Sequence, residues 1–309
     1  MRVGRCDDAC PLASRSQLKL DTPSTHTYLS LCLSVFLNVL STRRVGLYKL
    51  DWTPVRGGAG ERPRARIDRV FFAFGAMLEV LEHCRAVVTA DATVMTGAFP
   101  STLYTVVGKD ANNHLVPAAF MLSWTSEQAS DWVPFLRAVQ PRMSHVQVCI
   151  SDAAKGLING ISAAGWVHSR CALHMHRNMC QQRIAAGLRA KYVSTLAKQC
   201  RAMDFEYVLN TILQDCPPST RGKTEEFLRR NQTQYSAVTF LPDYPRFGDV
   251  LNNAAEAFNS ILVRASPGQL RPKDMGWISV MEALCACTQQ WHFQRYACEC
   301  VLLNILLPR

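Results

Sequence analysis

The stretch VQVCISDAAKGLINGISAAG, at residues 146–165, decides the fold class. Its first residues, 146–150, are mostly apolar and β-prone, which predicts a strand that ends at Ser151 and Asp152. Residues 153–164 are typical of a helix, and Gly165 is a helix-ending residue. A strand that passes through a polar turn into a helix is the repeating unit of α/β proteins.

The segments around this unit extend the same pattern. β-prone composition predicts strands at residues 86–90, 102–107, 116–122, 146–150 and 166–170, with turn residues at 108–113. Helical periodicity predicts helices at residues 71–83, 131–139, 153–164, 252–265 and over most of 176–250, including the chain from His174 onward. Hairpin-joined strands followed by alternating strands and helices predict an α/β protein with a mixed sheet and helices on its faces.

Three carboxylates occupy positions suited to binding a ligand. Asp91 and Asp152 each follow a predicted strand, at the edge where open sheets usually bind ligands. Glu256 lies in NNAAEAFNSIL at residues 252–262, where helical spacing puts it on one face with Asn252 and Asn259. Carboxylates are preferred ligands of Mg²⁺, and two ions about 4 Å apart can support phosphodiester chemistry. Taken singly, each residue also fits a plainer interpretation, an N-cap or turn for the aspartates and a solvated surface position for Glu256.

Composition and charge narrow the class of partner. The 34 Lys and Arg residues exceed the 24 Asp and Glu residues, and the net charge of +10 favours a polyanion such as DNA. The 13 cysteines are odd in number and scattered among apolar positions, which favours reduced thiols in an intracellular protein. An apolar run at residues 28–40 begins too late for a signal peptide and is shorter than the roughly 20 residues that cross a bilayer, so no membrane partner is expected.

The N-terminal segment, residues 1–66, is poorly defined. Its apolar run could be one buried helix or non-native sequence from an imperfect gene model, and both interpretations stay open. Residues 54–66 are rich in Gly, Pro and Arg and are expected to form a linker.

The motifs around the carboxylates occur in the order found in one family. They are His83-Cys84-Arg85, Asp91-Ala92-Thr93, Asp110-Ala111-Asn112, Glu127 with Trp132, Ser151-Asp152, Gly156, Cys171 with His174 and Asn178, and Arg246-Phe247-Gly248 with Asn253, Glu256, Asn259 and Leu262. In this order residues 67–295 resemble the transposase domain of Mutator-like elements (MULEs). The resemblance implies an RNase H-like core that begins at 67–178, an all-helical insertion at 179–250, and a catalytic helix with a C-terminal helical segment at 251–309.

The resemblance also implies a function. Asp91, Asp152 and Glu256 would be the catalytic residues and would bind Mg²⁺ or Mn²⁺, as two ions, for DNA strand cleavage and strand transfer. Cys171, His174, Asn253 and Asn259 would support the active site or contact DNA. The expected partners are the terminal repeats of the element, target DNA and further copies of the chain, and the expected location is the nucleus.

The sequence departs from the family pattern at several points. Ala92 replaces the usual Gly after the first Asp, and neither an N-terminal zinc-dependent DNA-binding domain nor a C-terminal zinc knuckle is evident. The cysteines at 285, 287, 298 and 300 loosely resemble such a knuckle, but their helical spacing favours a helix. A zinc site built from Cys171, His174, His176 and Cys180 is disfavoured against a structural or DNA-contacting role.

Three functions therefore compete. The first is a Mutator-like transposase, and the second is a domesticated or decayed transposase that acts as a non-enzymatic DNA-binding regulator. Retention of the three carboxylates favours the first, and the missing zinc modules favour the second. A third, another RNase H-like nuclease such as an exonuclease, is disfavoured by the long separation between Asp152 and Glu256.

Overall fold

The computed structural model describes most of the chain from residue 45 to residue 266. The described residues are 45–55, 64–96, 100–152, 154–199, 201–240, 244, 247–266, 274, 280, 283–284 and 286–287. The strands are β1 (Val45–Val55), β2 (Arg64–Phe74), β3 (Val87–Met95), β4 (Ser101–Lys109), β5 (Leu115–Ser123), β6 (Val148–Ser151) and β7 (Val167–Arg170). The α-helices are α2 (Gly75–Leu81), α3 (Ala129–Val139), α4 (Lys155–Ala163), α5 (Ala172–Gln181), α6 (Ala186–Ser194), α7 (Ala202–Gln214), α8 (Pro218–Phe240) and α9 (Asn253–Ala265).

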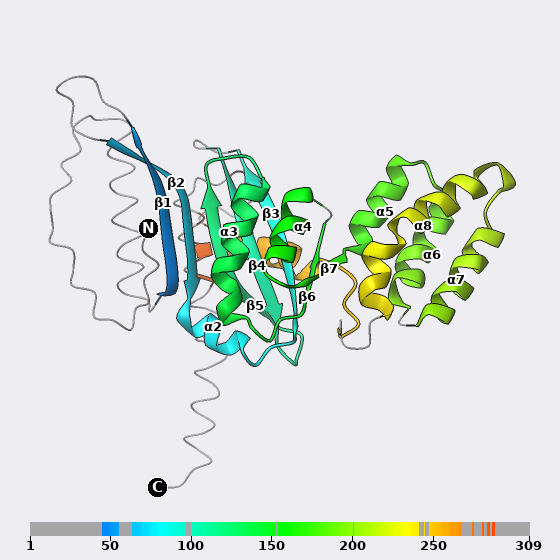
Figure 1. Ribbon diagram of the computed structural model, residues 1–309, viewed down its shortest axis with the longest axis horizontal. Helices are drawn as coiled ribbons and strands as arrows, with labels where there is room; N and C mark the ends of the chain where they lie inside the picture. Colours follow the sequence, from blue (N-terminus) through cyan, green and yellow to red (C-terminus); the bar gives the residue numbers. More distant parts are fainter. Residues whose placement is uncertain are drawn as a thin grey trace, which may run out of the picture.

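The strands form one mixed sheet in the order β1-β2-β5-β4-β3-β6-β7. Strands β1 to β5 pair antiparallel, whereas β3 pairs parallel with β6 and β6 pairs parallel with β7. Helices α3 and α4 lie against one face of the sheet and α9 lies against the other (Figure 1). The predicted mixed α/β sheet flanked by helices is therefore confirmed, with the turn at 108–113 closed by Asn113 at a φ of 66°.

Two sequence predictions near the N-terminal side are wrong. Residues 71–83 were expected to form one helix, but 71–74 belong to β2 and only 75–81 are helical. The expected linker at 54–66 is too long, because β1 extends to Val55 and β2 starts at Arg64; residues 56–63 lie outside the described residues. The apolar run at 28–40 lies outside the described residues. Segment 1–66 thus contributes a hairpin strand to the sheet.

The main core lies on both faces of the sheet and alternates along β2. Phe71 packs edge-on against Phe135 of α3, with ring centroids 5.6 Å apart, whereas its neighbour Phe72 packs against Phe120 of β5. Phe120 in turn stacks on Phe258 of α9 at 5.5 Å. Because successive residues of a strand point to opposite faces, a continuous aromatic run is what a doubly covered strand requires.

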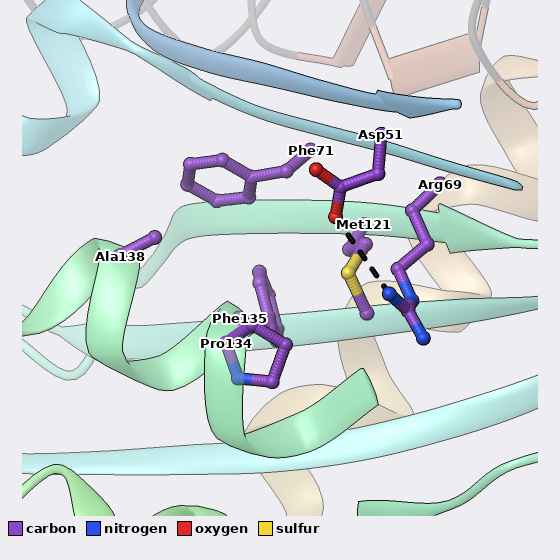
Figure 2. A pocket seen from close by; sticks show the side chains of 7 residues that line it. All are labelled: Asp51, Arg69, Phe71, Met121, Pro134, Phe135 and Ala138. Carbon is purple, nitrogen blue, oxygen red and sulfur yellow. Dashed lines mark ion pairs between the residues drawn. The ribbon is translucent and has the colours of Figure 1, made fainter. Parts of the chain in front are cut away.

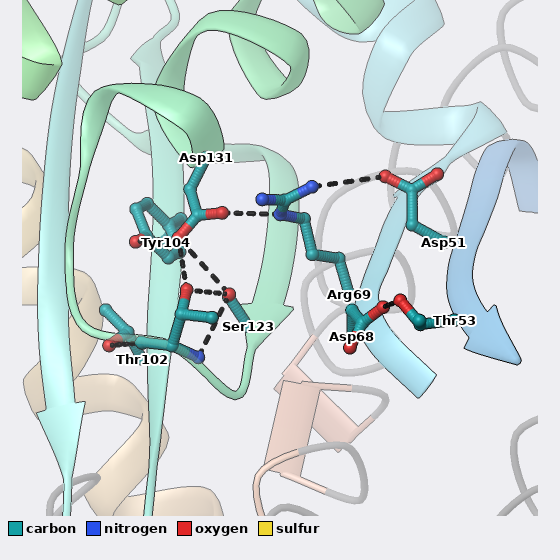
Figure 3. Close-up of polar contacts among 9 residues, drawn as sticks. Asp51, Thr53, Asp68, Arg69, Thr102, Tyr104, Ser123 and Asp131 are labelled. Carbon is teal, nitrogen blue, oxygen red and sulfur yellow. Dashed lines mark hydrogen bonds and ion pairs between the residues drawn. The ribbon is translucent and has the colours of Figure 1, made fainter. Parts of the chain in front are cut away.

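The buried carboxylate of Asp131 links α3 to β2. Asp131 is fully buried and accepts hydrogen bonds from Tyr104 (2.9 Å), Thr125 (2.7 Å) and Ser123 (3.2 Å), and it pairs with Arg69 of β2 (Figure 3). Arg69 also lies 3.7 Å from Asp51 of β1, beside a small pocket lined mostly by apolar side chains (Figure 2). A buried charge is tolerated only when it is paired and hydrogen-bonded, which this network achieves.

Helices α5 to α8 follow β7 and have a hydrophobic cluster of their own. Its fully buried members include Met175, Met179, Leu196, Phe205, Leu209 and Leu228. The prediction that residues 176–250 are mostly helical is confirmed for the described part of that range. Beyond α9, the described residues among 280–287 are helical, with Val280, Ala283, Leu284 and Cys287 buried. The described part of the chain contains no helix that is long and apolar enough to span a membrane.

Candidate active site

Two of the three predicted carboxylates lie in, or directly after, two neighbouring parallel strands. Strands β3 and β6 pair in register at Thr89 and Ile150, and Asp91 and Asp152 are each two residues further along. Asp91 lies within β3 rather than after it, because β3 continues to Met95 in pairing with β4. Its partner on β4 is Thr105. The neighbouring residue, Tyr104, packs on Trp132 of α3 and therefore faces α3. Since neighbouring residues of a strand face opposite ways, Asp91 points toward the α9 face.

Helix α9 brings Glu256 to Asp91. Buried Asn252 precedes the helix and donates from Nδ2 to the Ala90 carbonyl at 3.2 Å, and Asn259 donates from Nδ2 to Thr93 Oγ1 at 3.1 Å. These contacts attach α9 to β3 on both sides of Asp91. Glu256 is one helical turn from each asparagine, so it lies on the same side of α9.

The carboxylates interact electrostatically. The pKa of Asp91 is raised to about 7, chiefly by burial and then by the charges of Asp152, Glu256 and Glu127, against a backbone hydrogen bond from Ala92 that lowers it. Like charges that share a site disfavour ionisation of one another. Four carboxylates from β3, the end of β6, the turn before α3 and α9 therefore act on one region. This is the arrangement that a hard cation or a cationic group would stabilise.

A comparison of the chain with models of protein families finds a match in this region. Residues 87–178 match the MULE transposase domain. The match indicates a transposase-like function and thus an interaction with DNA, and it includes Asp91, Glu127 and Asp152. Glu256 and Asn259 lie C-terminal to the matched residues. No curated protein matches the chain.

Within the MULE transposase match, Cys171 and His174 have different surroundings. The buried Cys171 Sγ accepts a hydrogen bond from the backbone N–H of Asn252 at 3.2 Å, so it links the start of α5 to the start of α9. Burial raises the pKa of the Cys171 thiol, which keeps it protonated at neutral pH. His174 lies 3.2 Å from Arg177, and burial lowers its pKa although Asp152 and Glu256 oppose that shift. Cys171 is thus a packing contact, and His174 is a neutral group beside the carboxylates.

Arg177 of α5 also reaches the carboxylates. Its guanidinium lies 3.8 Å from Glu256 Oε1, and both side chains are partly open to solvent. An exposed ion pair at this distance is weak, so it leaves Glu256 free to exchange Arg177 for another cation.

The structure refines the predicted set of residues. Asn253 is exposed on the first turn of α9, whereas its neighbour Asn252 makes the contact with β3. Glu127 acts on Asp91, although its place in the sequence, in a polar turn before a helix, gave no sign of this beyond its occurrence in the family motif. Ala92, which replaces the usual Gly, packs against the main core from within β3.

The described residues contain no group of three or more His, Cys, Asp or Glu side chains close enough together to hold a metal ion. The carboxylates of the candidate site therefore do not form such a group. The suggested zinc ligands do not form such a group either. Cys171 contacts Asn252, whereas the exposed Cys180 lies 3.9 Å from His176 and contacts Arg189. The described cysteines are all free thiols.

Proposed function

We propose that this chain contains the catalytic core of a Mutator-like DNA transposase, with Asp91, Asp152 and Glu256 as its catalytic carboxylates. The observation that carries the proposal is that Asp91 of β3 interacts with the charges of both Asp152, at the end of β6, and Glu256 of α9. Several negative charges close together destabilise one another unless a bound cation or cationic group compensates them. The MULE transposase match at residues 87–178 supplies the class of chemistry.

The residues present suit a hard divalent cation, Mg²⁺ or Mn²⁺, in their donor chemistry. Carboxylate oxygens are preferred ligands of both ions, and a pair of ions can be shared between carboxylates. The fully buried Asn252, which holds the Ala90 carbonyl next to Asp91, has an Oδ1 atom that finds no partner among the described residues. An ordered water of a hydrated ion would satisfy this oxygen. The carboxylates would have to move closer to share an ion, since they do not converge as they stand.

The proposed reaction has two steps. Water attacks a phosphorus at the end of the element and the P–O3′ bond breaks, which frees a 3′-hydroxyl; that hydroxyl then attacks a phosphorus of the target DNA and displaces another 3′-oxygen. Bound cations would supply charge stabilisation for the attacking and leaving oxygens. The protein contributes positioning: β3 and β6 hold Asp91 and Asp152 in register, and Asn252 and Asn259 hold α9.

Other features support the same proposal. The strand order β5-β4-β3-β6-β7, antiparallel up to β3 and parallel after it, supports an RNase H-like core. The helices α5 to α8, with their separate cluster, support a helical insertion between that core and the Glu256 helix. The net charge of +10 suits binding to the terminal repeats and target DNA. Assembly of several copies on DNA and action in the nucleus are part of this proposal.

The test is nicking of supercoiled plasmid DNA by the full chain in Mg²⁺ or Mn²⁺. We expect Asp91→Asn, Asp152→Asn and Glu256→Gln each to reduce the nicking rate by more than about 100-fold, because even groups behind metal ligands contribute about 10- to 100-fold. Asp215→Asn is the control, since Asp215 pairs with Lys191 on the surface of the helical region. Nicking that persists at the wild-type rate in all three site variants would refute the proposed site.

A non-enzymatic relic of a transposase is the second candidate. The observation that favours it is that the carboxylates do not converge among the described residues. A relic would bind DNA, with an affinity that falls as salt increases, but the wild-type chain would not nick DNA in either cation. The plasmid assay and a DNA mobility-shift assay on the same preparation therefore separate the two functions.

A further inference from the structure

Positive charge is concentrated in one part of the chain. Residues 153–203, from the turn after β6 to the first turn of α7, contain eight Lys and Arg residues and no Asp or Glu, a charge of +8. Residues 204–240, the rest of α7 and α8, contain four Lys and Arg against five Asp and Glu, a charge of −1. A concentration of one sign of charge on neighbouring elements attracts a ligand of the opposite sign.

The two groups of basic residues also differ in their partners. On α8, Arg229 and Arg230 each form an ion pair with a glutamate one helical turn earlier, so their charges are compensated within the helix. Arg183, in the turn before α6, and Arg189, within α6, pair with no carboxylate among the described residues. The positive charge of the α5–α6 region is therefore available to an external anion.

Arg177 places this charge beside the candidate active site. The start of α5 is attached to the chain before α9, because the Ala172 N–H donates to the Val250 carbonyl at 2.8 Å. Further along α5, the Arg177 guanidinium lies 3.2 Å from His174 and 3.8 Å from Glu256. The Arg177 side chain is 56% exposed, so its remaining N–H groups can donate to a phosphate that arrives from solvent.

The same surface continues onto α6. Cys180, exposed and one turn beyond Arg177, contacts Arg189 of α6. The Nε–H of Arg189 has no acceptor among the described residues, so a rotamer turned toward a phosphate would gain a hydrogen bond. The exposed Arg183 has a φ of 59°, a conformation that Gly and Asn adopt more readily. The turn thus carries a long basic side chain where its backbone favours a smaller residue.

We propose that the α5–α6 surface, formed by Arg177, Arg183 and Arg189, binds the phosphate backbone of a DNA duplex and leads it to the candidate active site. The inference rests on the interaction with DNA in the proposed function and names the surface responsible. Guanidinium groups suit this partner because their planar fork donates two parallel hydrogen bonds to phosphate oxygens. Contacts to the backbone carry no sequence information, so the surface accepts duplexes of any sequence.

The test is binding of a fluorescent DNA duplex of about 30 base pairs to the full chain, followed by anisotropy between about 50 and 200 mM KCl. EDTA is present, so binding does not depend on a divalent cation at the carboxylates. The informative variant combines Arg177→Gln, Arg183→Gln and Arg189→Gln. We expect the slope of log Kd against log salt to fall by about 2–3 units and Kd to rise about 10-fold or more, because each lost phosphate contact removes about 0.9 unit.

The matched control removes the same charge from exposed positions of α8. It combines Lys223→Gln, Arg229→Gln and Arg230→Gln, and we expect it to change the slope by less than about half as much. A second measurement locates the duplex directly. Because Cys180 lies within the proposed surface, bound duplex should slow its alkylation by N-ethylmaleimide, followed by mass spectrometry of the peptide that contains it.

The other outcomes overturn the inference. Equal losses in the two triple variants, or Cys180 alkylation that DNA does not slow, would show that DNA is held elsewhere. If the α5–α6 triple variant does not fold, the single variants at the exposed Arg177 and Arg183 replace it, and unchanged slopes in both count against the surface. In each of these cases the wild type still binds DNA and the proposed function stands. If the wild type binds no duplex, both fail.

Discussion

Asp91 within β3 and Asp152 directly after β6 are each two residues beyond the Thr89–Ile150 pair of these two parallel strands. Adjacent strands are about 4.8 Å apart, so two carboxylates at equivalent positions are close neighbours. Their repulsion contributes to the raised pKa of Asp91, together with burial and with Glu256 on α9. The register of β3 and β6 is thus the feature on which the electrostatics of the site depend.

The first prediction concerns pH and Asp91. Its pKa rises from 3.8 to about 7 in the folded protein, so folding favours the protonated form. The stability associated with that proton is fully present below pH 4 and is lost as pH rises through about 7. We therefore expect Asp91→Asn to raise the melting temperature at pH 8 in EDTA by several degrees, and to have little effect near pH 4.

The measurement is thermal unfolding of both proteins at the two pH values. Asp215→Asn, at an exposed position, is the control and should behave as the wild type at both. A melting difference between Asp91→Asn and wild type that does not change between pH 4 and pH 8 would show that Asp91 has no raised pKa.

The second prediction concerns the contact between α3 and α4. Gly156→Ala would place a methyl group 2.7 Å from Ala129 N, a backbone atom that can move only with α3. We expect a loss of about 1–3 kcal/mol in the free energy of unfolding, measured by urea denaturation. Gly222→Ala in α8 is the matched control, because its added Cβ would meet nothing within 4 Å and the helix should gain up to about 1 kcal/mol. Equal effects at both glycines would disprove the close contact.

The third prediction distinguishes two adjacent asparagines. Asn252→Ala removes the hydrogen bond to the Ala90 carbonyl and leaves that region without its link to α9, so we expect a loss of about 1–3 kcal/mol and weaker Mn²⁺ binding. Asn253→Ala, at an exposed position, should change stability by less than about 0.5 kcal/mol. Urea denaturation measures both, and a larger effect at Asn253 would contradict the assigned contact.

The fourth prediction concerns the attachment of β2. Asp131→Asn removes the charge that pairs with Arg69 while Tyr104, Ser123 and Thr125 still point at the side chain. We expect a loss of about 1–3 kcal/mol in the free energy of unfolding, because the hydrogen bonds to a charged buried carboxylate are weakened and Arg69 keeps only its longer contact with Asp51. Asp204→Asn, which disturbs only a surface pair with Arg201, should cost less than about 1 kcal/mol. If both variants unfold at the same urea concentration, the buried network is not important for stability.

Local pattern was sufficient for much of the fold. The strands β3 to β7 and the helices α3, α4 and α9 were predictable because their apolar residues recur at the spacing of the element that they form. The same pattern identified Asp91 and Asp152 as polar residues at the ends of apolar runs. Family motifs, rather than spacing, related them to Glu256, which is far away in the sequence.

Tertiary structure decided between alternatives that the local sequence pattern fits equally well. Phe71, Phe72, Ala73 and Phe74 are all buried, a run that fits a helix or a strand covered on both faces, and only pairing with β1 and β5 makes it β2. Asn252 and Asn253 differ by one position, about 100° around a helix, so the docking of α9 selects between them. Helices α3 and α4 pack closely because Gly156 and Gly160 have no side chain at their contact. The types of residue in the site follow from the sequence, but their meeting depends on contacts between segments far apart in the chain.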